Sequence, residues 1–258
     1  MRGVVQYAFR RLVGGPGMQL ARILTPDGPM SGSYDAGTIT ADDGEYVVGV
    51  DGRLLPPCSP SALYCVGRNY GEKLAQMDYD RPDEPDFFIK PPTALLGHDA
   101  PLPYPSFTEE LTYAGELAAV IGHRCRNVTR SDVPDVIRGY TILNDVDALD
   151  QERRTARKAF DGSAPLGPWI ETAVDPTDIE MYTDINGERR QSDNTANMFF
   201  HPAEVVPFLS ARVTLQPGDV ISFGSPANPG TIKPGDVVEI TYDGIGTLRN
   251  TVTDPASS

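Results

Sequence analysis

The sequence predicts an α+β fold that is rich in β-strands and contains only a few short helices. Its 25 glycines and 24 prolines are scattered along 258 residues, a pattern typical of many short strands joined by turns. The apolar runs are short, and helical signals recur at Gly71–Met77, Asp132–Arg138 and His201–Leu209. A chain of this length can bury a sizeable core in one large domain with a small appendage.

Composition argues against several classes of function. The net charge of −14 disfavours a nucleic-acid partner, because phosphate binding requires a basic face. No apolar run reaches the length of about 18 residues that a membrane span needs, and Met1–Leu12 is too polar for a signal peptide. The three cysteines are irregularly spaced, and no histidine is spaced with a partner for zinc, so we expect reduced thiols and a cytoplasmic protein.

The chain divides into three predicted parts. Residues 1–17 precede a first strand at Met18–Leu24, and we expect them to form a flexible extension. Residues 18–60 carry short hydrophobic pieces broken by Gly, Asp and Pro, which predicts a small N-terminal β domain ending in a proline-rich linker. Residues 61–258 are predicted to form the large domain that carries the chemistry.

Two carboxylates stand at the ends of predicted strands in the large domain. Glu116 precedes the buried apolar run Leu117–Ile121, and the segment Gly139–Asp145 ends in the second one. Strand-end carboxylates that face one cleft are how proteins build an oxygen-ligand site for a hard divalent cation. Because side chains alternate along a strand, the position two before Glu116 shares its face, and Ala114 offers no ligand there.

Ten segments, in this order, carry a resemblance to one family: Tyr64–Tyr70, Phe88–Pro92, Tyr113–Leu117 with Val120–Gly122, Gly139–Asp145, Lys158–Asp161, Pro165–Ile170, Asn186–Glu188, Pro217–Ile221, Gly224–Pro226 and Gly244–Val252. Over about residues 61–253 the chain resembles the fumarylacetoacetate hydrolase superfamily. The resemblance implies a mixed β-roll or sandwich and a homodimer built through the large domain. It also implies an enzyme acting on a small β-dicarbonyl or 2-oxo acid, although fold alone does not fix the reaction.

The resemblance further implies Mg²⁺ or Mn²⁺ held by three carboxylates, and no organic cofactor. On this chain the metal ligands would be Glu116 and Asp145, with Ala114 at the third position. Mg²⁺ parts reluctantly with water and needs charged ligands, so we expect metal binding to be weak or absent.

The other implied positions are also altered. The family histidine corresponds to Lys73, and the substrate-binding arginine corresponds to Leu149. The family lysine is retained as Lys158, and with Lys73 it is the predicted catalytic group. The predicted substrate-binding residues, some of which also depart from the family pattern, are Tyr70, Gln76, Glu152, Thr195, Gly224 and Ser225.

The gain of Lys73 together with the loss of a carboxylate at Ala114 leads to a hypothesis. An ammonium group replaces the metal and pairs with Glu116 and Asp145; the alternative is that Lys73 is a surface lysine. We expect an enzyme that isomerises, cyclises or decarboxylates its substrate with little or no dependence on a metal. Natural-product metabolism is one setting for such an enzyme. Two further interpretations stay open: a conventional Mg- or Mn-dependent hydrolase or decarboxylase that uses water or Glu110 instead, and a non-catalytic binding protein on the same scaffold.

Overall fold

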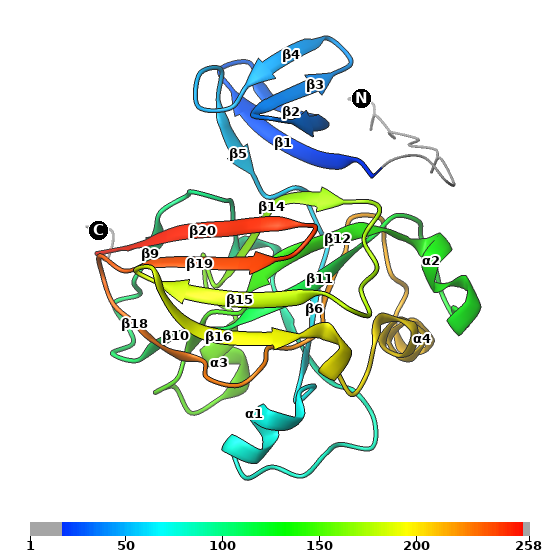
Figure 1. The fold of residues 1–258 in the computed structure, drawn as a ribbon, viewed down its shortest axis with the longest axis vertical. Helices are drawn as coiled ribbons and strands as arrows, with labels where there is room; N and C mark the ends of the chain where they lie inside the picture. Colours follow the sequence, from blue (N-terminus) through cyan, green and yellow to red (C-terminus); the bar gives the residue numbers. More distant parts are fainter. Residues whose placement is uncertain (1–16, 255–258) are drawn as a thin grey trace.

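The computed structural model describes residues 17–254 and shows a strand-rich protein (Figure 1). Its helices are short: α1 Gly71–Gln76, α2 Val133–Val136, α3 Arg154–Lys158 and α4 Pro202–Arg212, with 3-10 turns at Pro92–Ala94, Arg130–Asp132 and Thr195–Asn197. None of the helices within residues 17–254 is long and apolar enough to cross a membrane. The expected β-rich α+β class is confirmed.

The largest sheet has twelve strands in the order β4-β3-β2-β1-β14-β12-β11-β17-β6-β7, with β5 paired to β1 and β8 paired to β14. Its strands are β1 Gln19–Thr25, β2 Gly28–Asp35, β3 Thr38–Ala41, β4 Gly44–Val47, β5 Arg53–Leu55, β6 Leu63–Gly67, β7 Asp86–Lys90, β8 Leu95–Leu96, β11 Gly115–Ile121, β12 Ile137–Asn144, β14 Ala164–Glu171 and β17 Val220–Ser222.

Two smaller sheets complete the fold. One has five strands in the order β16-β15-β19-β20-β9: β9 Leu102–Pro103, β15 Glu180–Ile185, β16 Glu188–Asn194, β19 Val237–Tyr242 and β20 Gly246–Thr253. The other has three, in the order β13-β10-β18: β10 Leu111–Tyr113, β13 Asp147–Ala148 and β18 Gly230–Ile232. The chain passes from the three-stranded sheet into the large one at Ala114, between β10 and β11.

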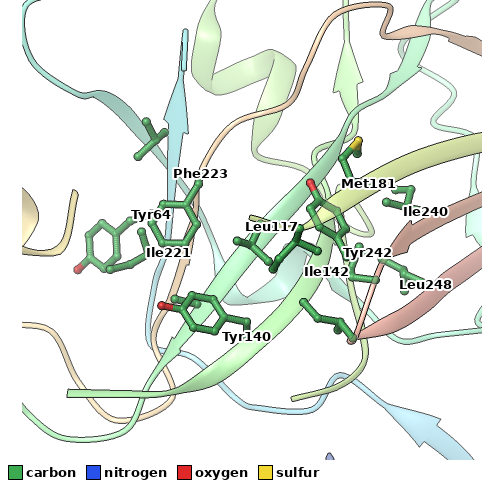
Figure 2. Packing of buried hydrophobic residues seen from close by; sticks show 14 of the residues in the cluster. Tyr64, Leu117, Tyr140, Ile142, Met181, Ile221, Phe223, Ile240, Tyr242 and Leu248 are labelled. Atoms are coloured by element: carbon green, nitrogen blue, oxygen red, sulfur yellow. The ribbon is translucent and has the colours of Figure 1, made fainter. Parts of the chain in front are cut away.

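Strand β11 is buried on both faces, which explains its uninterrupted apolar sequence. Leu117, Ala119 and Ile121 belong to the main core, whereas the alternate residues Ala118 and Val120 belong to a second core on the opposite face. In the main core, Leu117 and its neighbours on β12 meet side chains of β15, β19 and β20 (Figure 2). Each such fully buried apolar side chain contributes about 2 kcal/mol. The end of β11 that carries Glu116 is therefore held rigidly.

The N-terminal strands β1–β5 form a meander with its own small core of Ile23, Ile39 and Leu54. They lie at one end of the molecule, opposite α1 (Figure 1). The meander is continuous with the rest of the large sheet through β1, which pairs with β14 at Gln19↔Glu171. The predicted flexible extension, residues 1–17, lies outside the described residues except for its last residue.

The predicted helix at Asp132–Arg138 is too long at its C-terminal end. Helix α2 ends at Val136 and β12 begins at Ile137, because Ile137 pairs with Ile121 in the large sheet. The helices predicted near Gly71 and His201 are found as α1 and α4.

Candidate active site

The two predicted carboxylates meet where β11 and β12 lie side by side. These strands are antiparallel, with Gly115 opposite Asn144, and the Asp145 N–H donates to the Ala114 carbonyl at 2.9 Å, so Asp145 lies opposite Ala114. Glu116 follows two residues later on β11, where the charge of Asp145 acts on it. Both acids are buried, with exposed fractions of 3% and 5%. Two neighbouring carboxylates that are buried away from water require positive charge nearby.

Lysine side chains supply that charge to Asp145. Lys90 Nζ lies 2.9 Å from Asp145 Oδ1, and Lys158 Nζ lies 2.5 Å from Asp145 Oδ2. Lys158 Nζ also lies 3.1 Å from Asp147 Oδ2, and Asp147 in turn accepts two hydrogen bonds from the Arg157 guanidinium. Both oxygens of Asp145 are therefore engaged by ammonium groups.

The two lysines differ in the hydrogen-bonding capacity that they keep. Lys90 is fully buried, and its ammonium group also donates to the carbonyls of Val146 and Ser163, at 2.8 and 2.6 Å. Two of its three donors are used on these carbonyls, and its contact with Asp145 Oδ1 is an ion pair without a hydrogen bond. Lys158 donates a hydrogen bond to Asp145 and forms an ion pair with Asp147, and its side chain is 14% exposed. One N–H of Lys158 therefore remains for a ligand.

The two carboxyl groups acquire opposite electrostatic character. For Asp145, burial opposes ionisation, but Lys158 and Lys90 outweigh it and lower the pKa to about 2. For Glu116, burial and the nearby charge of Asp145 raise the pKa to about 7, although Ser222 and the lysines at 73 and 158 act in the other direction. The Glu116 Oε2 atom accepts a hydrogen bond of 3.3 Å from the Gly224 N–H. One acid is thus a permanent anion, and the other titrates near neutral pH.

Lys73 points into the same cluster from α1. It is half-buried, burial lowers its pKa, and Glu116, Lys158 and Asp145 all act on its charge. It is not the surface lysine of the alternative interpretation. The hypothesis pairs Lys73 with Glu116 and Asp145. At Asp145 the ion pairs are made by Lys158 and Lys90, and within residues 17–254 the side chain of Lys73 makes no ion pair with either acid.

Lysine is rare in this chain, which makes the cluster distinctive. The sequence contains four lysines, and three of them (73, 90 and 158) surround the two carboxylates. The fourth, Lys233, is exposed in the turn before β19.

The predicted substrate-binding residues take different places. Tyr70 is buried and its hydroxyl has no hydrogen-bond partner within residues 17–254. Gln76 lies on the surface and exchanges two hydrogen bonds with Asn228 of the C-terminal loop. Glu152 is exposed outside the cluster, and the Thr195 hydroxyl accepts a hydrogen bond from the Ile179 N–H, so neither supports the predicted role.

Residues that the sequence interpretation did not single out support the site. Asn69 ties the start of α1 to the C-terminal loop by donating to the Phe223 and Phe200 carbonyls. Gln191 accepts from the Gly115 N–H and donates to the Ser225 hydroxyl. The sequence offered one signal for Lys90, its position at the end of the apolar strand β7. Lysines are rarely buried, so a lysine in such a strand marks a position of interest.

The donor set does not fit a divalent metal. Ala114 offers no ligand atom, and both oxygens of Asp145 are held by ammonium groups. Among the residues that the structure describes there is no group of three His, Cys, Asp or Glu side chains placed to hold an ion. Glu110, the suggested substitute, is exposed.

The family model for the C-terminal part of fumarylacetoacetate (FAA) hydrolase matches residues 62–253. The chain belongs to the fumarylacetoacetate hydrolase family. The structure of 2-hydroxyhepta-2,4-diene-1,7-dioate isomerase from Mycobacterium marinum is similar, with a TM-score of 0.83 and 38% identity over 93% of this chain and 100% of that one. The resemblance seen in the sequence is thereby confirmed.

Two other relatives mark the range of chemistry in this family. Oxaloacetate tautomerase YisK from Bacillus subtilis is 34% identical over 207 residues, covering 74% of this chain and 69% of the relative. Fumarylpyruvate hydrolase from Pseudomonas aeruginosa, solved in complex with Mn²⁺ and pyruvate, has a TM-score of 0.72 at 29% identity, over 80% of this chain and 94% of that one. These three relatives are enzymes, and the structure of one of them contains Mn²⁺.

Proposed function

We propose that this protein is an isomerase or tautomerase that moves a proton between carbon and oxygen in a small β-dicarbonyl or 2-oxo acid, without a metal ion. The observation that carries the proposal is the pairing of Asp145 with two lysines beside a glutamate, Glu116, whose pKa lies near 7. A general acid–base group works best when its pKa is close to the working pH. An isomerase and a tautomerase among the relatives support this class of reaction.

Each group has a role in such a reaction. Glu116 takes a proton from the carbon next to the carbonyl and returns it to the oxygen, or the reverse. The free N–H of Lys158 binds the oxygen on which negative charge develops, which stabilises the enolate in a buried place. The Tyr70 hydroxyl and the Asn144 Nδ2 atom, both buried and without a hydrogen-bond partner within residues 17–254, are further donors for a substrate oxygen.

In this proposal the ammonium groups of the lysines stabilise the negative charge that a metal ion would stabilise in a carboxylate site. Asp145 keeps Lys158 in place and charged, since the pair with Asp145 and Asp147 raises the pKa of Lys158 against the effect of burial. The arrangement favours an anionic substrate, because Lys73 and Lys158 both carry unused hydrogen-bonding capacity at the cluster.

The test is the enol-to-keto conversion of oxaloacetate, followed by the loss of enol absorbance with protein treated with a chelator. We expect the metal-stripped protein to accelerate the conversion, and Glu116→Gln to lose about a hundredfold or more of that rate. The control is Glu45→Gln on the exposed strand β4, which should match the unmodified protein.

A second measurement separates the proposal from a metal-dependent hydrolase or decarboxylase. Calorimetric titration with Mn²⁺ should show no micromolar binding by the unmodified protein. Binding at that level, together with activity that appears only when Mn²⁺ is added, would refute the metal-free reaction and favour the conventional chemistry. Absence of any turnover over a panel of β-dicarbonyl and 2-oxo acids would favour the non-catalytic interpretation.

A further inference from the structure

Lys73 differs from the other two lysines of the cluster in having a free amine. Lys90 and Lys158 are fixed by ion pairs at 2.9 and 2.5 Å from Asp145. The side chain of Lys73 makes no hydrogen bond or ion pair with any residue between 17 and 254, although it is half-buried and faces charged groups. An amine that is held in place but has no partner is available to react.

Helix α1 aims Lys73 at the site. Gln76, three residues later and hence on the same side of the helix, is anchored to Asn228 by two hydrogen bonds of 3.1 and 3.0 Å. That anchor joins α1 to the loop that follows β17, whose Gly224 N–H donates to Glu116. Leu74 is buried beneath the helix and fixes its other side.

The electrostatic surroundings favour a neutral amine. Burial lowers the pKa of Lys73, and the charge of Lys158 lowers it further, while Glu116 and Asp145 oppose both. A lysine that is desolvated beside a second cation is a common form of amine nucleophile.

We propose that Lys73 forms a Schiff base with the ketone of its substrate and so gives the protein a decarboxylase activity towards β-keto acids. This inference rests on the proposed function for the substrate class, since it places a keto acid in the same cluster. It assigns to Lys73 a covalent role that proton transfer by Glu116 does not require.

The step balances without a cofactor. Lys73 Nζ attacks the keto carbon, the carbonyl oxygen takes up two protons and leaves as water, and a C=N⁺ bond remains. The bond from the neighbouring carbon to the β-carboxylate then breaks, and its electron pair moves to the iminium nitrogen as carbon dioxide departs. A proton from water adds to the resulting enamine carbon, and a second water molecule hydrolyses the imine to release the ketone and Lys73.

The experiment is reductive trapping with oxaloacetate. The full-length protein is incubated with oxaloacetate and sodium cyanoborohydride, digested, and analysed by mass spectrometry for lysines that have gained the mass of a keto acid less one oxygen. With only four lysines in the chain, each can be followed. Lys73→Arg keeps a positive charge but cannot form the adduct, and Lys233→Arg on the exposed turn is the matched control.

We expect one adduct, at Lys73, in the unmodified protein and in Lys233→Arg, and the loss of both the adduct and carbon dioxide release in Lys73→Arg. An unlabelled Lys73 at saturating oxaloacetate, or equal labelling of Lys73 and Lys233, would overturn the inference. The metal-free tautomerase assay is read separately: enol-to-keto turnover without an adduct would leave the proposed function standing and remove only the covalent step.

Discussion

Replacing Glu116 by glutamine should stabilise the protein at alkaline pH and leave it unchanged in acid. The pKa of this buried carboxyl is raised from 4.5 to about 7, so above pH 7 the folded state holds an anion that the unfolded chain solvates more easily. At about 1.4 kcal/mol per pKa unit, the charged form costs the folded state about 3 kcal/mol. Glutamine has nearly the same shape and carries no charge, so it avoids that cost.

The sign follows from proton linkage. As the pH falls from 7 towards 4.5, the folded protein binds a proton at Glu116 before the unfolded chain does, so this group makes the folded state more stable in acid. The difference in unfolding free energy between Glu116→Gln and the unmodified protein should therefore be about 3 kcal/mol at pH 8 and close to zero at pH 4.

Urea denaturation at both pH values measures this difference, with the fluorescence of Trp169 as the signal, because it is the only tryptophan and stacks on Tyr34. Glu45→Gln on the exposed strand β4 serves as the control and should change little at either pH. An equal effect of Glu116→Gln at pH 4 and pH 8 would refute the argument, because it would mean that the carboxyl is not desolvated as the geometry implies.

Two further substitutions test the surroundings of the site. Lys158→Met should cost about 3 kcal/mol in urea denaturation because a buried carboxylate loses a partner. In the unmodified protein the pKa of Asp145 is about 2, below its usual 3.8, so the ionised group stabilises the folded state until the pH falls through this range. Without Lys158 the pKa of Asp145 should rise, and the stability should be lost at a higher pH than in the unmodified protein. An unchanged dependence of stability on acidic pH would contradict the pairing. Gly224→Ala should cost about 2 kcal/mol and reduce turnover, because φ is +82° there and a Cβ would lie 3.1 Å from Asn69 Cβ. Gly235→Ala also has a positive φ, of +93°, but open space around it; an equal loss in both variants would show that crowding is not the cause.

The predicted elements succeeded where local pattern and burial agree. The apolar run Leu117–Ile121 became β11 because both of its faces are covered. The prediction failed at Asp132–Arg138, where pairing with β11 converts the end of a helical pattern into a strand. Local propensity yields here to strand pairing, because the pairing partner is set by tertiary structure and not by the local pattern.

The sequence by itself determined the family, the β-rich fold, the two carboxylates at Glu116 and Asp145, and the missing ligand at Ala114, because each of these lies in a short motif with its own spacing. Only the tertiary structure decided which lysine serves which acid. Lys90 and Lys158 come from β7 and α3, and their reach to Asp145 depends on how these elements pack, which no spacing along the chain encodes. Among the residues that the structure describes, the same packing leaves the Lys73 amine without a partner and buries Glu116 away from water, so the chemistry that these two residues can perform is a property of the fold.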